Sequence, residues 1–167
     1  MKVYIEHSEI VEMCKRIGGE LTEKFNGKNP LVVCVLKGAA PFHSELMKHI
    51  QTDMEVDYIQ AQSYEGTEST GTVKLIKDLE VDIEGRDVVI VEDIVDTGRT
   101  LLALKNELLS RNPTSLTFVT MLDKPSRRVV DFKADYVGKT IDNLFVLGFG
   151  LDYNQKYRNL KDIYVMD

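Results

Sequence analysis

The sequence predicts an α/β fold with a mostly parallel, twisted sheet and helices on both faces. Two continuous apolar runs, residues 31–36 and 88–91, have the composition of strands that are buried on both faces of a parallel sheet. Each run is followed by a polar loop and then by a helical pattern, at residues 41–50 and 101–109. A third apolar run, residues 115–122, adds a further strand to this order of strand, loop and helix.

A first helix is predicted over residues 8–25, because apolar side chains recur there at helical spacing and Ser8 is a suitable N-cap. Residues 54–59 alternate as in a strand, and residues 73–76 resume a strand after the polar stretch 63–71. A long hairpin is therefore predicted. Short strands are expected at residues 135–138, 144–148 and 163–166.

The chain has 167 residues, a length that suits one domain, and a formal net charge of −6. This charge argues against a nucleic-acid binder of the generic basic kind. The N-terminal residues lack the apolar region of a signal peptide, and no apolar run approaches the roughly 18 residues of a membrane span. Cys14 and Cys34 lie among apolar residues, so we expect reduced core thiols in a reducing compartment.

The loop after the central apolar run predicts a phosphate site. Gly98 allows the backbone to approach a bound group closely, and free N–H groups at the start of the next helix attract an anion. Thr97 and Thr100 add hydroxyl donors. The glycine and lysine spacings of a P-loop and of a dinucleotide fold are both missing from the sequence.

Two adjacent carboxylates, Glu92 and Asp93, stand where the central strand is expected to end. Carboxylates accept hydrogen bonds from sugar hydroxyls and also complete a Mg²⁺ shell. Phosphate donors beside paired carboxylates therefore imply a phosphorylated sugar. A solvated acidic turn is the alternative for a generic Asp-x-Gly loop, but the thirteen residues 88–100 are far more specific than such a loop.

Residues 88–100 closely resemble the phosphoribosyl-diphosphate binding motif of type I phosphoribosyltransferases, in the form of the hypoxanthine-guanine branch. Four further segments match that family in order: residues 36–38, 63–64, 122–125 and 145–158. The resemblance therefore covers nearly the whole chain. It implies the type I phosphoribosyltransferase fold, with residues 1–167 as a single domain whose small hood is built from the terminal segments.

The resemblance implies a purine salvage enzyme. Such an enzyme transfers 5-phosphoribose from phosphoribosyl diphosphate to N9 of hypoxanthine or guanine, giving IMP or GMP and pyrophosphate, with Mg²⁺ as cofactor. Its partners would be these small molecules, without nucleic acid or membrane. We expect a cytoplasmic homodimer or homotetramer.

By the same resemblance, Asp96 would take the proton from purine N7, in keeping with the reach of a general base. Glu92 and Asp93 would hold the ribose hydroxyls and contribute to the metal site, and the loop 97–100 would anchor the 5-phosphate. Lys37 and Gly38 match the family loop that faces the pyrophosphate, which implies a cis peptide bond before Lys37; Arg158 would contact pyrophosphate and Asp152 would ligate Mg²⁺.

The resemblance also assigns the purine site. Lys124 falls at the position that contacts the 6-oxo group, and Phe145 would stack on the base while the main chain of Val146 meets its edge. Ser63 and Tyr64 match the opening of a lid that closes over the reaction centre. Pattern alone would place Phe145 in the core, and would make Lys124 an ordinary charge at a strand end.

Other activities remain as alternatives. A phosphoribosyltransferase for xanthine or adenine would keep the same motif, although Lys124 argues against adenine. An RNA-binding regulator with this fold is disfavoured by the charge of −6 and by the ending Leu151-Asp152-Tyr153. An acidic phosphoryl-transfer domain is disfavoured because the spacing from Asp93 is not Asp-x-Asp-x-Thr. Arg127 and Arg128 are interpreted as surface charge or a subunit contact.

Overall fold

The protein is described by a computed structural model that covers residues 1–63 and 72–167. Its main feature is a six-stranded sheet in which β2, β3, β5, β6 and β7 run parallel and β4 is the antiparallel edge strand. In spatial order the strands are β4 (Val73–Lys77), β3 (Glu55–Ser63), β2 (Leu31–Val35), β5 (Asp87–Val95), β6 (Ser115–Asp123) and β7 (Tyr136–Thr140).

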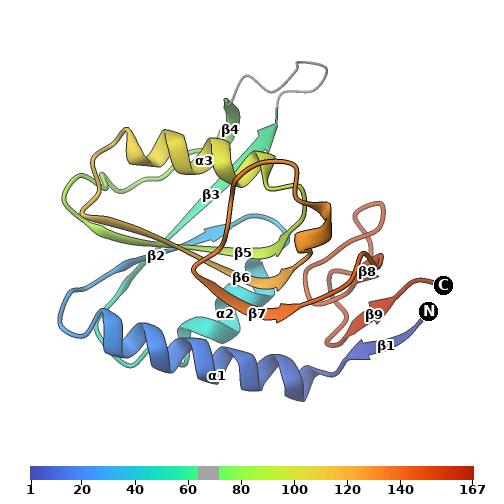
Figure 1. The fold of residues 1–167 in the computed structure, drawn as a ribbon. Helices are drawn as coiled ribbons and strands as arrows, with labels where there is room; N and C mark the ends of the chain where they lie inside the picture. Colours follow the sequence, from blue (N-terminus) through green and yellow to red (C-terminus); the bar gives the residue numbers. More distant parts are fainter. Residues whose placement is uncertain (64–71) are drawn as a thin grey trace.

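Helices cover both faces of this sheet. Figure 1 shows α1 (His7–Lys24) and α2 (Ala40–Met47) on one side, and α3 (Arg99–Leu109) on the other. Within β5, Val89 and Val91 pack in the cluster with α1 and α2, while Val88 and Ile90 pack in the cluster with α3. This alternation explains why residues 88–91 of the strand are all apolar, and the predicted α/β fold is confirmed.

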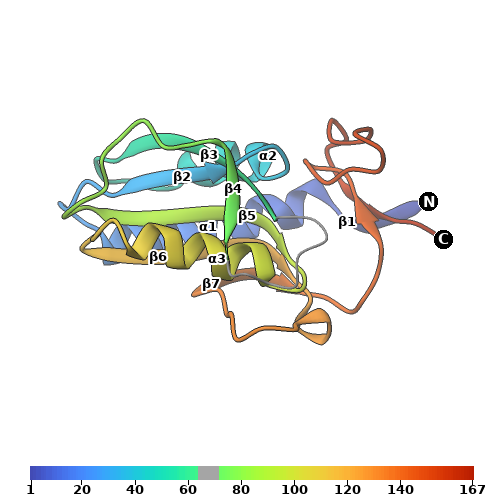
Figure 2. The same cartoon turned by 90° about the horizontal axis from the view of Figure 1, so that it is seen from above.

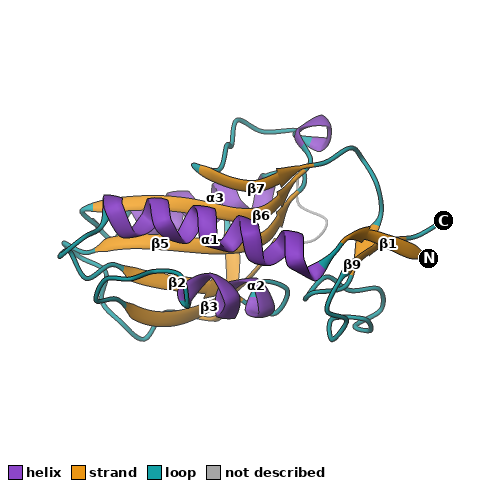
Figure 3. Ribbon diagram, turned by 90° about the horizontal axis from the view of Figure 1, so that it is seen from below, coloured by secondary structure: helices purple, strands orange, loops and turns teal. Residues whose placement is uncertain are grey.

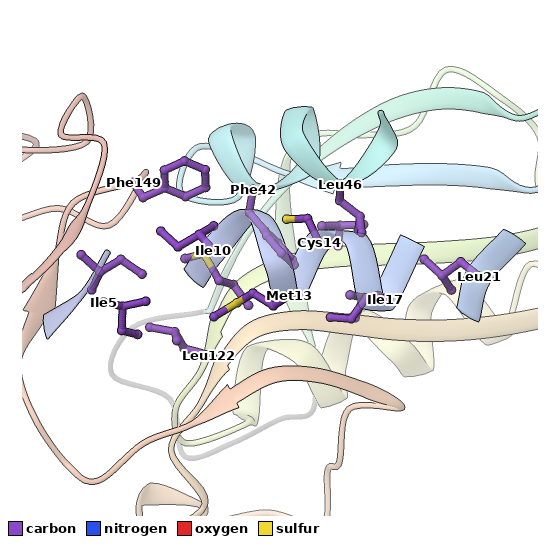
Figure 4. Packing of buried hydrophobic residues seen from close by; sticks show 14 of the residues in the cluster. Ile5, Ile10, Met13, Cys14, Ile17, Leu21, Phe42, Leu46, Leu122 and Phe149 are labelled. Atoms are coloured by element: carbon purple, nitrogen blue, oxygen red, sulfur yellow. The ribbon is translucent and has the colours of Figure 1, made fainter. Parts of the chain in front are cut away.

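A second, three-stranded antiparallel sheet forms a hood from the two ends of the chain. Its strands, in spatial order, are β1 (Lys2–Ile5), β9 (Ile163–Val165) and β8 (Val146–Leu147). Figures 2 and 3 show this sheet beside one end of the main sheet, next to the start of α1. Figure 4 shows Ile5 and Phe149 of the hood close to Ile10 and Met13 of α1, in one apolar cluster.

Several predicted boundaries shift. The first helix begins at His7 with Glu6 as N-cap, so the N-cap role predicted for Ser8 is wrong. The His7 N–H instead donates to Asp162 Oδ1 of the hood (2.7 Å). Strand β5 does not end before the carboxylates but continues to Val95, because it keeps pairing with β6. Strand β1 was not predicted, since its partner β9 lies at the far end of the chain.

The predicted hairpin is confirmed by the antiparallel pairing of β3 with β4, which reaches Ser63 opposite Val73. The lid predicted between these strands, including Tyr64, lies outside the described residues. Cys14 and Cys34 are free and buried, and burial raises the pKa of each thiol to about 12. Among the helices of the described residues, none has the length and apolarity required to cross a membrane.

Candidate active site

The predicted phosphate loop lies between the carboxyl end of β5 and the start of α3. Gly98 is the N-cap of α3 and has a left-handed backbone, with φ of +85°. A Cβ on Gly98 would lie 2.9 Å from Arg128 Cδ and 3.2 Å from Val130 Cγ2, so both backbone conformation and space require glycine. A cavity of about 230 Å³ opens at this loop, and its lining is Glu92, Ile94, Asp96, Thr97, Gly98, Thr100 and Leu101.

Arg128 holds this loop in place through hydrogen bonds and an ion pair. The interpretation of this residue as surface charge is therefore wrong. Its side chain is 15% exposed and forms an ion pair with Asp123 at the end of β6. Its Nη1 donates to the main-chain oxygen of Asp96 (2.7 Å), and its Nε donates to that of Phe132 (2.9 Å). The guanidinium therefore ties the phosphate loop to the segment after β6. Arg127, in contrast, is half-exposed and pairs with the Asp96 carboxylate (3.0 Å).

Arg128→Met is expected to lower the free energy of unfolding by about 3 kcal/mol, because it leaves Asp123 as a largely buried carboxylate without its partner. Arg127→Met is the matched control and should cost no more than about 1 kcal/mol, since that pair faces solvent. Urea unfolding of both variants measures the difference. Equal losses in the free energy of unfolding for the two variants would contradict the stabilising role assigned to Arg128.

The carboxylate pair lies on β5 beside this loop. The Asp93 N–H donates to Glu92 Oε1 (2.9 Å), and the Ile94 N–H donates to Asp93 Oδ1 (2.7 Å). Burial raises the pKa of Glu92 well above its usual value, and the neighbouring Asp93 charge raises it further; burial also raises the pKa of Asp93. An ionised pair in this place favours a ligand that brings a cation or hydroxyl donors.

The Lys37 loop packs directly on this pair. The peptide bond between Leu36 and Lys37 is cis, as the resemblance implied. A Cβ on Gly38 would lie 1.9 Å from Asp93 Oδ2, and a Cβ on Gly150 would lie 2.0 Å from the Gly38 oxygen. Gly38 therefore packs against the Asp93 carboxylate, and Gly150 of the hood packs against Gly38. Because neither glycine has a side chain, three parts of the chain come together at this place.

Gly38→Ala is expected to destabilise the protein by about 1–3 kcal/mol, the usual cost of overpacking, because the new methyl group would overlap the Asp93 carboxylate. Gly19→Ala in α1 is the matched control: its Cβ would meet nothing within 4 Å, and the substitution should stabilise the helix by up to about 1 kcal/mol. Urea unfolding tests both values. A Gly38→Ala variant as stable as the native protein would refute the close packing described above.

The loop between β8 and β9, residues 148–162, is called the C-terminal loop here, and it brings Arg158 to the Lys37 loop. Arg158 Nη1 donates to the Gly150 oxygen (2.7 Å), and its Nη2 lies 3.5 Å from Asp152 Oδ1. Arg158 also acts electrostatically on Asp93, where it lowers the pKa against the larger effect of burial. Among the buried side-chain atoms of the described residues, Arg158 Nε is the one without a hydrogen-bond partner. An unpartnered guanidinium N–H at this position is a free donor for an anion.

The structure does not gather the three predicted metal ligands into one cluster. Within residues 1–63 and 72–167, no set of three or more His, Cys, Asp or Glu side chains has the arrangement of a metal site. Glu92 and Asp93 are adjacent, whereas Asp152 accepts the Gln155 N–H (2.9 Å) and lies beside Arg158. The carboxylates can therefore contribute one or two ligands to a cation that takes its other ligands from a substrate or water.

The predicted base site has an exposed aromatic ring. Phe145 is 50% exposed rather than part of the core, and its ring stands edge-on to Tyr153, with centroids 5.7 Å apart. Val146 is buried in β8. Lys124 is 8% exposed at the end of β6, where its main-chain N–H donates to the main-chain oxygen of Val95 (2.9 Å). A free aromatic face and a largely buried ammonium are both suited to a planar polar ligand.

Three residues at the site had no role in the sequence-based prediction: Arg128, Tyr153 and Gln155. Tyr153 belongs to the matched segment 145–158, so its place near the ring of Phe145 had a partial signal in the sequence. Arg128 and Gln155 had none, because their roles depend on contacts with distant parts of the chain.

The sequence of this chain is similar to those of known phosphoribosyltransferases. A family model described as a phosphoribosyl transferase domain matches residues 3–154. The hypoxanthine-guanine phosphoribosyltransferase of Streptococcus thermophilus is 51% identical over 166 residues, which cover 99% of this chain and 92% of that protein.

Solved structures agree as well. A hypoxanthine phosphoribosyltransferase from Staphylococcus aureus superposes with a TM-score of 0.96 at 46% identity, covering 100% of this chain and 91% of that one. The enzyme from Trypanosoma cruzi, in complex with the product IMP, gives a TM-score of 0.94 at 39% identity, with 100% and 94% covered. Similarity of this extent in sequence and in fold shows that the chain belongs to the phosphoribosyltransferase family, in its hypoxanthine-guanine branch with the type I fold.

Proposed function

We propose that this protein is a purine salvage enzyme. It transfers the 5-phosphoribosyl group from phosphoribosyl diphosphate to N9 of hypoxanthine or guanine, which gives IMP or GMP and pyrophosphate. The observation that carries the proposal is the carboxylate pair Glu92 and Asp93, which lies between a phosphate loop and two cations, Lys37 and Arg158. A 5-phosphate, two ribose hydroxyls and a pyrophosphate have this same order along the substrate.

The barrier of this reaction is the departure of pyrophosphate from C1, which leaves positive charge on the ribose ring. Lys37 and Arg158 stabilise the negative charge that grows on the leaving group, and Arg158 has a buried N–H free to do so. The N–H groups and hydroxyls of residues 97–100 hold the 5-phosphate. Because the loop is fixed by Arg128, its donors are positioned before the substrate binds.

Asp96 accepts the N7 proton of the purine as N9 attacks C1. Its carboxylate is half-exposed, lines the loop cavity and pairs with the equally exposed Arg127. An ion pair in solvent is worth about 1 kcal/mol or less. The Asp96 carboxylate can therefore leave Arg127 at little cost and accept a proton from a purine that reaches it.

The donor set suits Mg²⁺. Glu92, Asp93 and Asp152 carry hard oxygen atoms, of which one or two would ligate a magnesium ion that takes its remaining ligands from substrate phosphates and water. When bound, Mg²⁺ neutralises charge on the diphosphate and so makes it a better leaving group. Burial raises the pKa values of Glu92 and Asp93, and a bound cation would favour the ionised form of both carboxylates.

The purine is held by Phe145, which stacks on the ring, by Lys124, which donates to the 6-oxo group, and by the main chain of Val146 at the base edge. Ser63 and Tyr64 open a lid that excludes water from the reacting centre. Residues 1–167 act as one phosphoribosyltransferase domain with its hood, in a cytoplasmic homodimer or homotetramer.

The test is incubation of the protein with phosphoribosyl diphosphate, Mg²⁺ and each purine base, followed by chromatography of the nucleotides. IMP and GMP should form, together with pyrophosphate. Consumption of xanthine or adenine in preference to hypoxanthine and guanine would assign the alternative substrates. Absence of any nucleotide product, with the protein folded, would refute the proposal and return attention to an RNA-binding regulator, which the similarity to enzymes does not favour.

A further inference from the structure

One side chain of the C-terminal loop connects the two cations of the site and has no part in the chemistry described above. The amide oxygen of Gln155 accepts a hydrogen bond from Lys37 Nζ (3.3 Å) and another from Arg158 Nη2 (3.2 Å). Lys37 follows β2 of the main sheet, whereas Arg158 lies in the loop between β8 and β9 of the hood. The contact therefore joins the two halves of the candidate pyrophosphate site.

We propose that Gln155 is a positioning residue for the pyrophosphate group: its amide oxygen holds Lys37 and Arg158 at one place before the substrate arrives. This inference rests on the proposed function, because it takes these two cations as the pyrophosphate site. Two like charges repel each other when they are brought together without an anion. A shared neutral acceptor offsets part of that repulsion and leaves both charges available for phosphate oxygens.

The donors that remain allow the ligand to bind without displacing Gln155. A lysine ammonium has three N–H groups and a guanidinium has five. Lys37 uses one of its donors on Gln155 in the structure, and Arg158 Nε has no partner among the described residues. Gln155 therefore acts as a support for the two cations and does not occupy the place of the phosphate.

The backbone holds Gln155 in this position. Its N–H donates to Asp152 Oδ2 (2.9 Å), and its φ of +68° is left-handed, a conformation that non-glycine residues adopt at a cost. The flanking residues Tyr153 and Lys156 exchange two main-chain hydrogen bonds, of 3.1 and 3.0 Å, which close the loop around it. The loop is thus built so that one amide side chain faces the two cations.

The experiment compares Gln155→Met with Gln155→Glu by calorimetric binding of inorganic pyrophosphate in the presence of Mg²⁺. Methionine has the same length as glutamine but no oxygen, so the affinity should fall roughly 10–100-fold, the size of one hydrogen bond to charged groups. Glutamate keeps the acceptor but adds a negative charge that neutralises the cations, so it should weaken binding more than methionine does. In steady state, KM for phosphoribosyl diphosphate should rise while KM for hypoxanthine stays the same.

Asn159→Ala is the matched control, since it removes an exposed amide of the same loop that forms no hydrogen bond within the described part of the chain. Its pyrophosphate affinity should equal that of the native protein. Gln155→Met that binds pyrophosphate as well as or better than the native protein, while Lys37→Met loses binding, would overturn the inference and leave the proposed function in place. Failure of the native protein to bind pyrophosphate would overturn both.

Discussion

Asp96→Asn is expected to lower kcat by roughly 10²–10⁴-fold, the share that a positioned general base usually contributes. In the native protein Arg127 Nε donates to Asp96 Oδ1. Asparagine has nearly the same shape as aspartate and keeps an oxygen that can accept this hydrogen bond. The main-chain oxygen of Asp96 keeps its bond from Arg128 in the variant, so the phosphate loop should retain its form. Binding of phosphoribosyl diphosphate should therefore change little.

Asp131→Asn is the matched control for Asp96→Asn. Asp131 is exposed in the segment after β6, which packs against Gly98 of the phosphate loop. Its substitution therefore removes a nearby negative charge and leaves the cavity lining intact. Single-turnover kinetics separate the chemical step from product release. An unchanged rate for Asp96→Asn in that measurement would remove Asp96 from the mechanism, whereas an equal loss in both variants would point to a general effect of charge.

The layered core could be predicted from the sequence because each buried strand has its own local signal. β2, β5 and β6 are apolar along most of their length, and burial on both faces requires that composition. The end of β5 could not be predicted in this way. Glu92 and Asp93 look like the residues of a loop, and only the pairing with β6 keeps them in the strand.

The candidate site likewise has a part that could be predicted from the sequence and a part that could not. The phosphate loop lies in one continuous segment, so its residues are visible together in the sequence. Arg128 acts on a main-chain oxygen 32 residues away, and Gln155 acts on a lysine 118 residues away. No local pattern specifies such contacts, since an arginine or a glutamine in a polar loop is ordinary surface composition until the fold gives it a partner.

We expect the choice of base to depend on Lys124. An ammonium group has three donors and no acceptor, so it can meet the O6 acceptor of hypoxanthine or guanine but not the amino group of adenine. Because Lys124 is 8% exposed, its charge would lie against that amino group with little water to compensate. Sites built around such a contact reject the mismatched analogue by roughly 10⁴–10⁵-fold, and we expect that ratio of kcat/KM between hypoxanthine and adenine.

Lys124→Ala should raise KM for the 6-oxopurines much more than KM for phosphoribosyl diphosphate, and should reduce the discrimination against adenine. Lys133→Ala is the matched control, because Lys133 is an exposed lysine of the same connection and should leave both constants unchanged. Steady-state kinetics with hypoxanthine and adenine on the three proteins measure these effects. Near-normal kinetics for Lys124→Ala would make this lysine a simple strand-end charge. Efficient use of adenine by the native protein would overturn the 6-oxopurine assignment and leave the phosphoribosyltransferase family assignment in place.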